Sequence, residues 1–277
     1  MPISVIVLTF NSEATIGATL ESARAVSDDI HVVDSFSTDR TLEIARAAGV
    51  QIVQHPFESY GAQRNWAIDT LPLKHEWQLH LDADERLSPE LARALPAVTQ
   101  DGQSDGTVGH YIPRLVHFHG RPLRHGGMYP IYHLRLFRRG RGRCETRKYD
   151  QHFRCDGPTD RLDAPMIDDI RLPLGEWTAR HNRWADMEVE EILNPDRSAI
   201  PGGRGDPVAE KRTQRDRYYR QPLFLRAFLL FLYRYIWKRG FLDGTEGLIF
   251  YVLQTFWFRF LVDAKLYERR KAAPKAQ

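Results

Sequence analysis

Short apolar runs alternate with segments of helical spacing through the first third of the chain, and this alternation constrains the fold more than any other feature. The apolar, largely β-branched runs occupy residues 3–10, 30–33, 50–53 and 77–81. The helical segments between them occupy residues 12–26, 38–49 and 62–71. Parallel strands buried on both faces need such crossover helices. We therefore predict an α/β fold with a Rossmann-like open mixed sheet flanked by helices.

Polar residues follow three of these predicted strands, at residues 9–13, 34–39 and 82–85. Ligands of open α/β sheets bind beyond the carboxyl ends of the strands, so these segments are the expected site. The first turn lacks the glycine fingerprint of dinucleotide-binding folds, and the chain has no phosphate-binding P-loop motif. Both observations argue against a dinucleotide cofactor and against ATP held by a P-loop.

Two carboxylates separated by one residue, Asp82 and Asp84, come directly after the last of these strands. Burying such groups unpaired is unfavourable, so packing explains them poorly. A hard divalent cation such as Mg2+ or Mn2+ takes one or two carboxylates together with phosphate oxygens. One aspartate can thus serve the metal and the other a sugar or ribose hydroxyl. The alternative is that the acidic residues only precede the helix that Ser88 and Pro89 begin.

A further acidic residue, Asp34, ends the second predicted strand, where it can accept hydrogen bonds from a base or ribose. In the alternative interpretation this segment only caps the next helix through Ser37, Thr38 or Asp39. The two interpretations are compatible: Asp34 can serve the nucleotide while Thr38 or Asp39 caps the helix.

Four ordered segments, residues 3–13, 33–42, 61–67 and 81–85, resemble the blocks of family-2 inverting glycosyltransferases, which have the GT-A fold. Order and spacing agree as well as residue type. Within that family the chain is most similar to the lipopolysaccharide core β-1,4-glucosyltransferase-like group. Three more segments support this closer similarity, at residues 135–139, 156–158 and 241–244.

The resemblance implies a role for seven residues in binding a UDP-sugar donor with Mg2+ or Mn2+. Asp34 would contact the base, Arg64 would support the base or the diphosphate, and Asp82 would hold the ribose. Asp84 would ligate the metal ion. The remaining three residues would border the nucleotide: Thr9, Asn11 and Glu13.

An inverting transfer also needs a base that takes the proton of the acceptor hydroxyl. The resemblance places an acidic residue in the second half of the chain, and its expected position falls on Gln151, which cannot act as a base. We therefore predict Asp150 as the catalytic base, with Glu145 and His152 as rivals. The alternative is that Asp150 is a surface residue of a charged loop.

Three arginines of one short segment, Arg135, Arg138 and Arg139, suit either a diphosphate or an anionic acceptor. A solvated charged edge explains the same pattern. The formal net charge of +3 gives no reason to expect a nucleic-acid partner.

The chain divides by composition into a nucleotide-sugar-binding half at residues 1–108 and an acceptor-side half at residues 109–200. A linker at residues 201–221 and an amphipathic helical, membrane-associating region at residues 222–277 follow. The apolar amino terminus has no basic lead and is interpreted as a strand rather than a signal peptide. Two cysteines form neither a disulfide framework nor a metal-ligand spacing.

The C-terminal region contains two aromatic-rich apolar runs, at residues 222–237 and 248–262, that are interrupted by charged or polar residues. Neither reaches the ~20 uncharged residues that cross a bilayer. Basic aromatic helices with a wide apolar face suit the membrane interface. The alternatives are packing on the catalytic domain or on a second subunit, which would make a homo-oligomer.

These observations together predict an inverting glycosyltransferase that moves a sugar from a UDP-sugar to a lipid-linked saccharide acceptor in envelope polysaccharide or lipopolysaccharide synthesis. It would work as a peripheral protein at the cytoplasmic face of the bacterial inner membrane. The alternatives are a glycosyltransferase that acts on polyprenyl phosphate and a non-catalytic, nucleotide-binding, membrane-associated protein.

Overall fold

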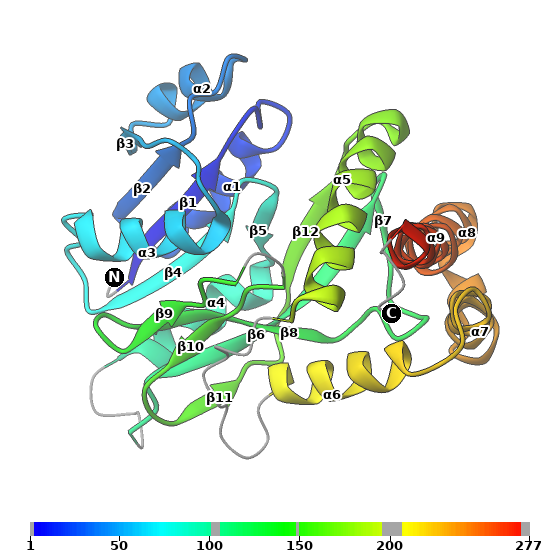
Figure 1. Ribbon diagram of the computed structural model, residues 1–277. Coiled ribbons are helices and arrows are strands. Elements are labelled where there is room, and N and C mark those ends of the chain that lie inside the picture. The colour runs from blue at the N-terminus through cyan, green and yellow to red at the C-terminus, as the bar shows by residue number, and fades with distance from the viewer. Residues whose placement is uncertain (1–2, 101–105, 148–149, 196–206, 273–277) are drawn as a thin grey trace. The chain divides into compact units, whose positions relative to one another are not determined.

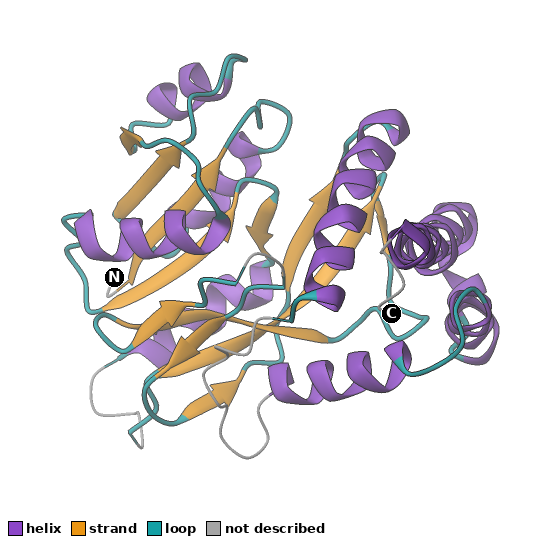
Figure 2. Cartoon of the chain, viewed as in Figure 1, coloured by secondary structure: helices purple, strands orange, loops and turns teal. Residues whose placement is uncertain are grey.

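A computed structural model describes residues 3–100, 106–147, 150–195 and 207–272. Two compact units emerge from its contacts. The sheet unit comprises the described parts of residues 1–120, 130–146 and 151–171. The helical unit comprises the described parts of residues 121–129, 147–150 and 172–277. Figure 2 shows strands interleaved with helices in the first of these and mostly helices in the second.

The sheet unit begins with the predicted alternation. Its first elements are β1 (Ile3–Thr9), α1 (Ile16–Arg24), β2 (Asp29–Asp34), α2 (Thr41–Ala47), β3 (Gln51–Gln54), α3 (Tyr60–Thr70) and β4 (Trp77–Asp82). After these come β5 (Glu85–Leu87), α4 (Pro89–Thr99), β6 (Gly109–Phe118) and β8 (Ile131–Arg138). The unit ends with β9 (Gly142–Cys144), β10 (Phe153–Cys155), β11 (Thr159–Arg161) and β12 (Met166–Ile170). The predicted α/β class and mixed sheet are confirmed.

The sheet has the strand order β3-β2-β1-β4-β8-β6-β12-β5. The strands β1 to β4 are parallel, and β8 runs antiparallel to both β4 and β6. The short strands β9 and β10 form a separate antiparallel hairpin. Parallel pairing brings the carboxyl ends of β1, β2 and β4 to one edge of the sheet.

The strand β1 is buried on both faces, which explains its unbroken apolar sequence. Ile3, Val5 and Val7 pack in a core that includes residues of α1 and α4. Ile6 and Leu8 point to the other face and pack with a residue of α3. The helices α1 and α3 therefore cover opposite faces of the sheet (Figure 1).

The helix α2 corrects one prediction. Thr38 does not cap it, because the helix begins later and the capping position is Arg40, whose side chain makes no capping hydrogen bond. Asp39 instead accepts the backbone N–H of Thr41 through Oδ1, at 3.0 Å. The hydroxyl of Ser59, by contrast, caps α3 by accepting the N–H of Ala62.

The helical unit contains β7 (Arg121–Pro122), α5 (Leu174–Leu193), α6 (Pro207–Tyr219), α7 (Leu225–Leu232) and the π-helical segment η1 (Tyr233–Trp237). It continues with the 3-10 segment η2 (Gly240–Asp243), α8 (Gly244–Tyr251), the π-helical segment η3 (Val252–Trp257) and α9 (Phe258–Ala272). Its core joins α5, through Ala185 and Val189, to α9, through Phe258, Val262 and Leu266. Part of the predicted linker lies outside the described residues, and residues 207–219 of it form α6.

Candidate functional site

The strand register brings three of the predicted site residues to the same edge of the sheet. Thr9, the last residue of β1, pairs with Asp34, the last residue of β2. On the other side of β1, Leu8 pairs with Asp82, the last residue of β4. The candidate site is therefore built where the carboxyl ends of β2, β1 and β4 lie next to one another.

Asp34 is fully buried, and its carboxylate organises the turn that follows β2. It accepts the N–H of Ser37 at 3.0 Å, the hydroxyl of Ser37 at 2.5 Å and the side-chain amide of Gln54 at 2.9 Å. Between them, Phe36 adopts a left-handed φ of 62° and leaves its ring half exposed. Asp34 thus supports the shape of this edge, and its contact with a base stays a prediction.

Asn11 and Glu13 fasten the loop after β1 to the loop after β2. Asn11 Oδ1 accepts the N–H of Thr38 at 2.8 Å, and the hydroxyl of Ser37 accepts the N–H of Asn11 at 2.8 Å. Glu13 Oε2 accepts the N–H of Arg40 at 3.0 Å, while Asp39 Oδ2 accepts the N–H of Glu13 at 3.1 Å. Four reciprocal hydrogen bonds therefore join two loops that would border the nucleotide.

Asp82 lies between two guanidinium groups. Arg64 of α3 donates to Oδ1 at 2.6 Å, and Arg135 of β8 donates to Oδ2 at 2.9 Å. Burial opposes ionisation of this carboxyl group, but the two cations outweigh it and lower the pKa of Asp82 to about 2. The side chain of Asp82 is still 32% exposed, so it faces the open edge of the sheet.

Glu85 closes the turn that contains the two predicted aspartates. Its Oε1 accepts a hydrogen bond from Arg135 at 2.5 Å, and its Oε2 accepts the backbone N–H of Asp82 at 2.9 Å. Burial raises the pKa of Glu85, even though Arg135 opposes the shift. No sequence motif predicts this role of Arg135 and Glu85, because the two residues lie 50 positions apart in the sequence.

Asp84 lies in the turn between β4 and β5 and is partly buried. Its backbone carbonyl accepts the N–H of Asp169 at 2.9 Å, which holds the turn against β12. Among the described residues, no three His, Cys, Asp or Glu side chains are grouped to hold a metal ion. These residues still suit Mg2+ or Mn2+ if Asp84 supplies one carboxylate ligand and the phosphates of the nucleotide-sugar supply most of the other oxygen ligands.

Three buried polar atoms of residues at this edge have no hydrogen-bond partner in the part of the chain that the structure describes. They are the hydroxyl of Thr9, the Nε atom of Arg135 and the Nη1 atom of Arg64. Buried polar groups are normally satisfied, so a ligand or water is expected to complete them. The guanidinium of Arg64 lies over the ring of Phe153, with its central carbon 4.9 Å from the ring centroid.

Aromatic side chains stand exposed in the loops that leave β1, β2 and β3 and at the first residue of α3. Phe10 is 58% exposed and Phe36 is 53% exposed. Phe57 and Tyr60 are similarly exposed and contact each other edge to face at 5.1 Å. Exposed rings at a ligand-binding edge offer stacking surfaces for a planar base. These rings are not among the predicted site residues, although an aromatic residue shortly after each strand is a signal that the sequence contains.

The predicted base and its rivals fall in different units. In the sheet unit, Glu145 is buried and accepts hydrogen bonds from Arg154 Nε at 3.0 Å and from the N–H of His152 at 3.2 Å. In the helical unit, Asp150 forms ion pairs with Lys211 at 2.7 Å and Arg215 at 3.1 Å. Asp150 is thus held by α6, and its role as the base stays a prediction.

The other two arginines of the predicted triplet lie away from this edge. Arg138 pairs with Glu76 and covers the ring of Trp77 at 4.8 Å, and Arg139 donates to the carbonyl of Leu73. Since Arg138 pairs with the first residue of β4, both lie at the amino end of that strand. Only Arg135 of the three reaches Asp82.

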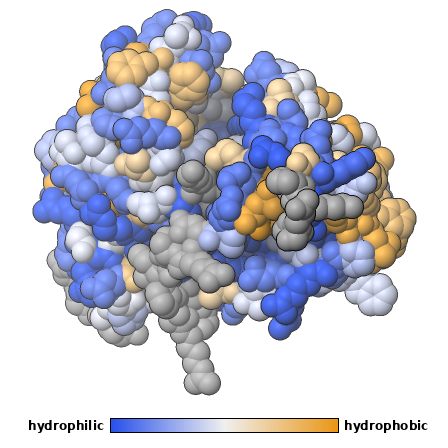
Figure 3. All heavy atoms as spheres, viewed as in Figure 1, coloured by the Kyte–Doolittle hydropathy of each residue, from blue (hydrophilic) through white to orange (hydrophobic). Residues whose placement is uncertain are grey.

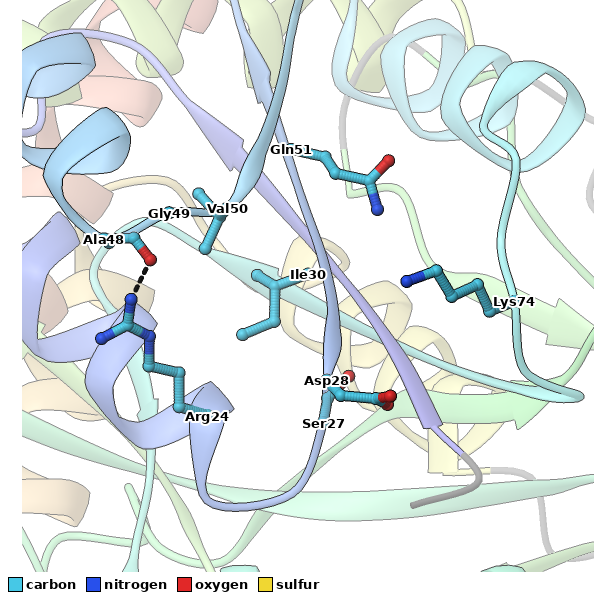
Figure 4. A pocket seen from close by; sticks show the side chains of 9 residues that line it. All are labelled: Arg24, Ser27, Asp28, Ile30, Ala48, Gly49, Val50, Gln51 and Lys74. Atoms are coloured by element: carbon cyan, nitrogen blue, oxygen red, sulfur yellow. Dashed lines mark hydrogen bonds between the residues drawn. The ribbon is translucent and has the colours of Figure 1, made fainter.

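A pocket at the opposite end of the strands is not part of the candidate site (Figure 4). Its lining includes Asp28 and Ile30 at the start of β2, Gln51 at the start of β3, and Lys74. Arg24 reaches across it to the carbonyl of Ala48. No described carboxyl end of a parallel strand contributes to the lining.

Comparisons with known proteins find similar glycosyltransferases. The model of the family described as "Glycosyl transferase family 2" matches residues 4–156. The lipopolysaccharide core biosynthesis glycosyltransferase LpsC of Rhizobium meliloti (strain 1021) is 25% identical over 288 residues, which cover 99% of this chain and 96% of LpsC. An uncharacterized glycosyltransferase of Rickettsia bellii (strain RML369-C) is 34% identical over 114 residues, which are 41% of this chain and 38% of that protein.

A solved structure is similar along nearly the whole chain. The mannosyltransferase PcManGT from Pyrobaculum calidifontis, in complex with GDP-Man and Mn2+, matches with a TM-score of 0.54 at 16% sequence identity. The match covers 98% of this chain and 88% of that one. At this identity the similarity shows the fold.

Proposed function

The chain belongs to glycosyl transferase family 2, and from that premise we propose that it transfers a sugar, with inversion, from a UDP-sugar to a lipid-linked saccharide acceptor of the bacterial envelope. It is a glycosyltransferase with the GT-A fold that its sequence predicted.

The observation that carries the donor site is the convergence of Thr9, Asp34 and Asp82 at one sheet edge beside Arg64 and Arg135. The cations favour an anionic ligand, while the exposed rings nearby favour a planar base. A nucleoside diphosphate has both features. Asp82, held ionised by its two arginines, offers a carboxylate acceptor for the ribose hydroxyls.

Asp84 would hold Mg2+ or Mn2+ against the donor diphosphate. The metal ion, when bound, would neutralise the negative charge that develops on the leaving diphosphate. The turn is fixed on both sides, by Glu85 at the N–H of Asp82 and by Asp169 at the carbonyl of Asp84. PcManGT was solved with Mn2+, which supports a divalent ion for this fold.

The acceptor hydroxyl would lose its proton to Asp150, with Glu145 and His152 as rivals. Asp150 is held in place by ion pairs with Lys211 and Arg215 of α6. Glu145 pairs with Arg154 of β10 in the sheet unit. The similarity to LpsC along the whole chain supports a saccharide of the lipopolysaccharide core as the acceptor class.

Calorimetric titration of the full chain with UDP, GDP and CDP, each with and without Mn2+, tests the donor assignment. We expect UDP to bind and to need Mn2+. The variant Asp84→Ala should weaken UDP binding at least about tenfold, because the metal ion loses its protein carboxylate. The control is Glu90→Ala, an exposed acidic residue of α4 in the same unit.

Each alternative result removes a definite part of the proposal. Preference for GDP or CDP would replace the UDP assignment. Equal binding with and without Mn2+ would remove the metal role of Asp84. Failure of all three nucleotides to bind to folded protein would overturn the donor site itself.

A further inference from the structure

The helices α7 and η1 expose an apolar stripe along one side. We call it the interfacial stripe, and its members are 46–79% exposed: Leu225, Phe228, Leu229, Tyr233, Ile236 and Trp237. Spacings of three and four residues put these side chains on one helix face. Trp237, at its end, is the most exposed of the large hydrophobic residues that the structure describes. The stripe is thus an unusual surface for a helix in water.

The opposite side of the same helix is locked into the helical unit. Arg226 donates to Asp263 of α9 from Nε at 2.9 Å and from Nη2 at 2.5 Å, and both side chains are buried. Asp263 also accepts the N–H of Phe224 at 2.7 Å. Ala227 is fully buried beside this pair. Because these contacts set the rotation of α7, the interfacial stripe cannot turn inward while they hold.

The apolar surface continues from α7 onto α9. The ring of Phe224 lies 5.0 Å from that of Phe260 and 6.3 Å from that of Tyr267, and all three rings are exposed. Figure 3 shows hydrophobic side chains gathered at the margin where the C-terminal helices lie. The surface is therefore wider than a single helix face.

The charged residues within the segment that carries the stripe have one sign. Residues 217–242 contain six lysines and arginines and no aspartate or glutamate. Four of these cations are exposed, with Arg217 and Arg220 before the stripe and Lys238 and Arg239 at its end. Such a surface complements anionic lipid headgroups. A symmetric contact with a second copy would instead bring these cations close to one another.

A bilayer-spanning arrangement fits less well. The helical run Gly240–Ala272 is long and apolar enough to cross a membrane by length and composition, and 39% of its most apolar window is buried inside the protein. That buried side includes Phe258, Val262 and Leu266, which pack on α5, and Asp263, which pairs with Arg226. Crossing the bilayer would remove these partners and expose a charge to lipid.

We propose that the interfacial stripe lies in the headgroup region of an anionic membrane, with Ile236 and Trp237 inserted and with Lys238 and Arg239 on lipid phosphates. This inference deepens the proposed function, from which it takes only the lipid-borne acceptor. It names the surface through which the enzyme reaches that acceptor.

Flotation of the full chain with lipid vesicles tests the proposal. The chain should float with vesicles that contain phosphatidylglycerol and much less with pure phosphatidylcholine. The double variant Ile236→Ser/Trp237→Ser should reduce the floated fraction at least about tenfold, because its apolar anchor is lost. The matched control is Met187→Ser/Leu193→Ser, which removes two exposed apolar side chains of α5 and should float like the wild type.

Two further measurements locate the contact. Tryptophan emission should shift to the blue on vesicle addition and be quenched by lipids brominated in the acyl chain. Trp237→Phe should lose most of that response while still floating. Lys238→Gln/Arg239→Gln should float less with phosphatidylglycerol, and its binding should depend less on salt.

Two results would overturn the inference. The first is wild-type protein that is folded, as measured by circular dichroism, but does not float with phosphatidylglycerol vesicles. The second is a stripe variant that turns a dimer into a monomer in light scattering and floats unchanged, since a second copy would then cover the stripe. Nucleotide titration of the same variants keeps the donor site separate: vesicle binding without UDP binding contradicts the proposed function alone.

Discussion

Asp82 combines two roles at the residue scale, because it ends β4 and also pairs with two buried guanidinium groups, those of Arg64 and Arg135. Arg135 is shared between Asp82 and Glu85, so one guanidinium holds both the strand end and the turn after it. The same two carboxylates raise the pKa of Arg135, whose burial alone would lower it. This buried, hydrogen-bonded cluster fixes the position of the Asp82 carboxylate that would contact the ligand.

Replacing Arg135 tests this cluster. Arg135→Met should lower the free energy of unfolding by about 3–5 kcal/mol, because Glu85 would be left buried without its cation. Arg138→Met is the matched control, since Arg138 pairs with an acidic residue that is 52% exposed and should lose no more than about 1 kcal/mol. Urea unfolding of both variants gives the comparison. Equal losses would show that burial of the Arg135 cluster contributes nothing special.

The identity of the base is a second question at this scale. Asp150→Asn should reduce kcat by about 10²-fold or more and leave UDP affinity unchanged, as expected for loss of a general base. Glu145→Gln serves as the comparison, and Glu145 lies beside Arg154 in the sheet unit. Single-turnover transfer with saturating donor measures both. The reverse pattern, with loss only in Glu145→Gln, would reassign the base to Glu145.

The helix α3 explains at the element scale why residues 61–67 form a compact motif. A Cβ atom on Gly61 would lie 2.3 Å from the backbone oxygen of Glu145, so only glycine allows the helix to approach the hairpin. Asn65 then exchanges two hydrogen bonds of 2.9 Å with the backbone of Cys144. Both contacts position Arg64, which lies between them in sequence and reaches Asp82.

A Cβ atom at Gly61 should therefore displace the whole element. Gly61→Ala should destabilise the fold by about 1–3 kcal/mol and weaken UDP binding, because the helix cannot relax against backbone atoms. Gly175→Ala is the control, since Gly175 is helical and has open space around it, and it should stabilise by up to about 1 kcal/mol. Thermal unfolding with and without UDP separates the two. If Gly61→Ala left both stability and UDP binding unchanged, the β9–β10 hairpin would have moved to accommodate the added Cβ atom.

At the scale of the whole molecule, we expect the two units to respond differently to acid. In the helical unit, His181 stacks on Trp177 at 3.4 Å and donates through Nδ1 to the carbonyl of Trp177. Burial, and to a lesser degree the nearby arginines, lowers its pKa to about 4. In the sheet unit, the lowered pKa of Asp82 keeps that carboxylate ionised down to a pH of about 2.

The direction of each pH dependence follows from the difference between the folded and unfolded pKa values. Because the folded unit holds His181 neutral, the contribution of His181 to the free energy of unfolding is complete above the unfolded pKa of about 6.5. About 3 kcal/mol of it is lost as the pH falls towards 4, since the unfolded chain then binds the proton first. The contribution of Asp82 is present above pH 3.8 and is lost only as the pH falls towards 2. Hydrogen exchange at pH 7 and pH 4.5, corrected for intrinsic rates, should show loss of protection in α5 and α9 first. The variant His181→Phe should remove that difference, and earlier opening of β1 and β4 would contradict it.

The sequence determined the parts of this protein that depend on neighbours along the chain. Alternating apolar runs and helical segments predicted β1 to β4 with their crossover helices, since strand burial and helix amphipathicity are local patterns. Parallel strands end at one edge, so the sequence alone assigns residues 9–13, 34–39 and 82–85 to one edge of the sheet.

The tertiary structure decided what depends on contacts between distant residues. Arg135 meets Glu85 across 50 positions of sequence, and Asp150 meets Lys211 across 61. Nothing in either segment alone signals these pairs, because a charge has no preferred partner until packing brings one within reach. Tertiary contacts likewise give Arg135 and Arg138 different partners, although the two residues are close in sequence. They also decide which side of α7 faces outward, because Arg226 on the other side is buried against Asp263.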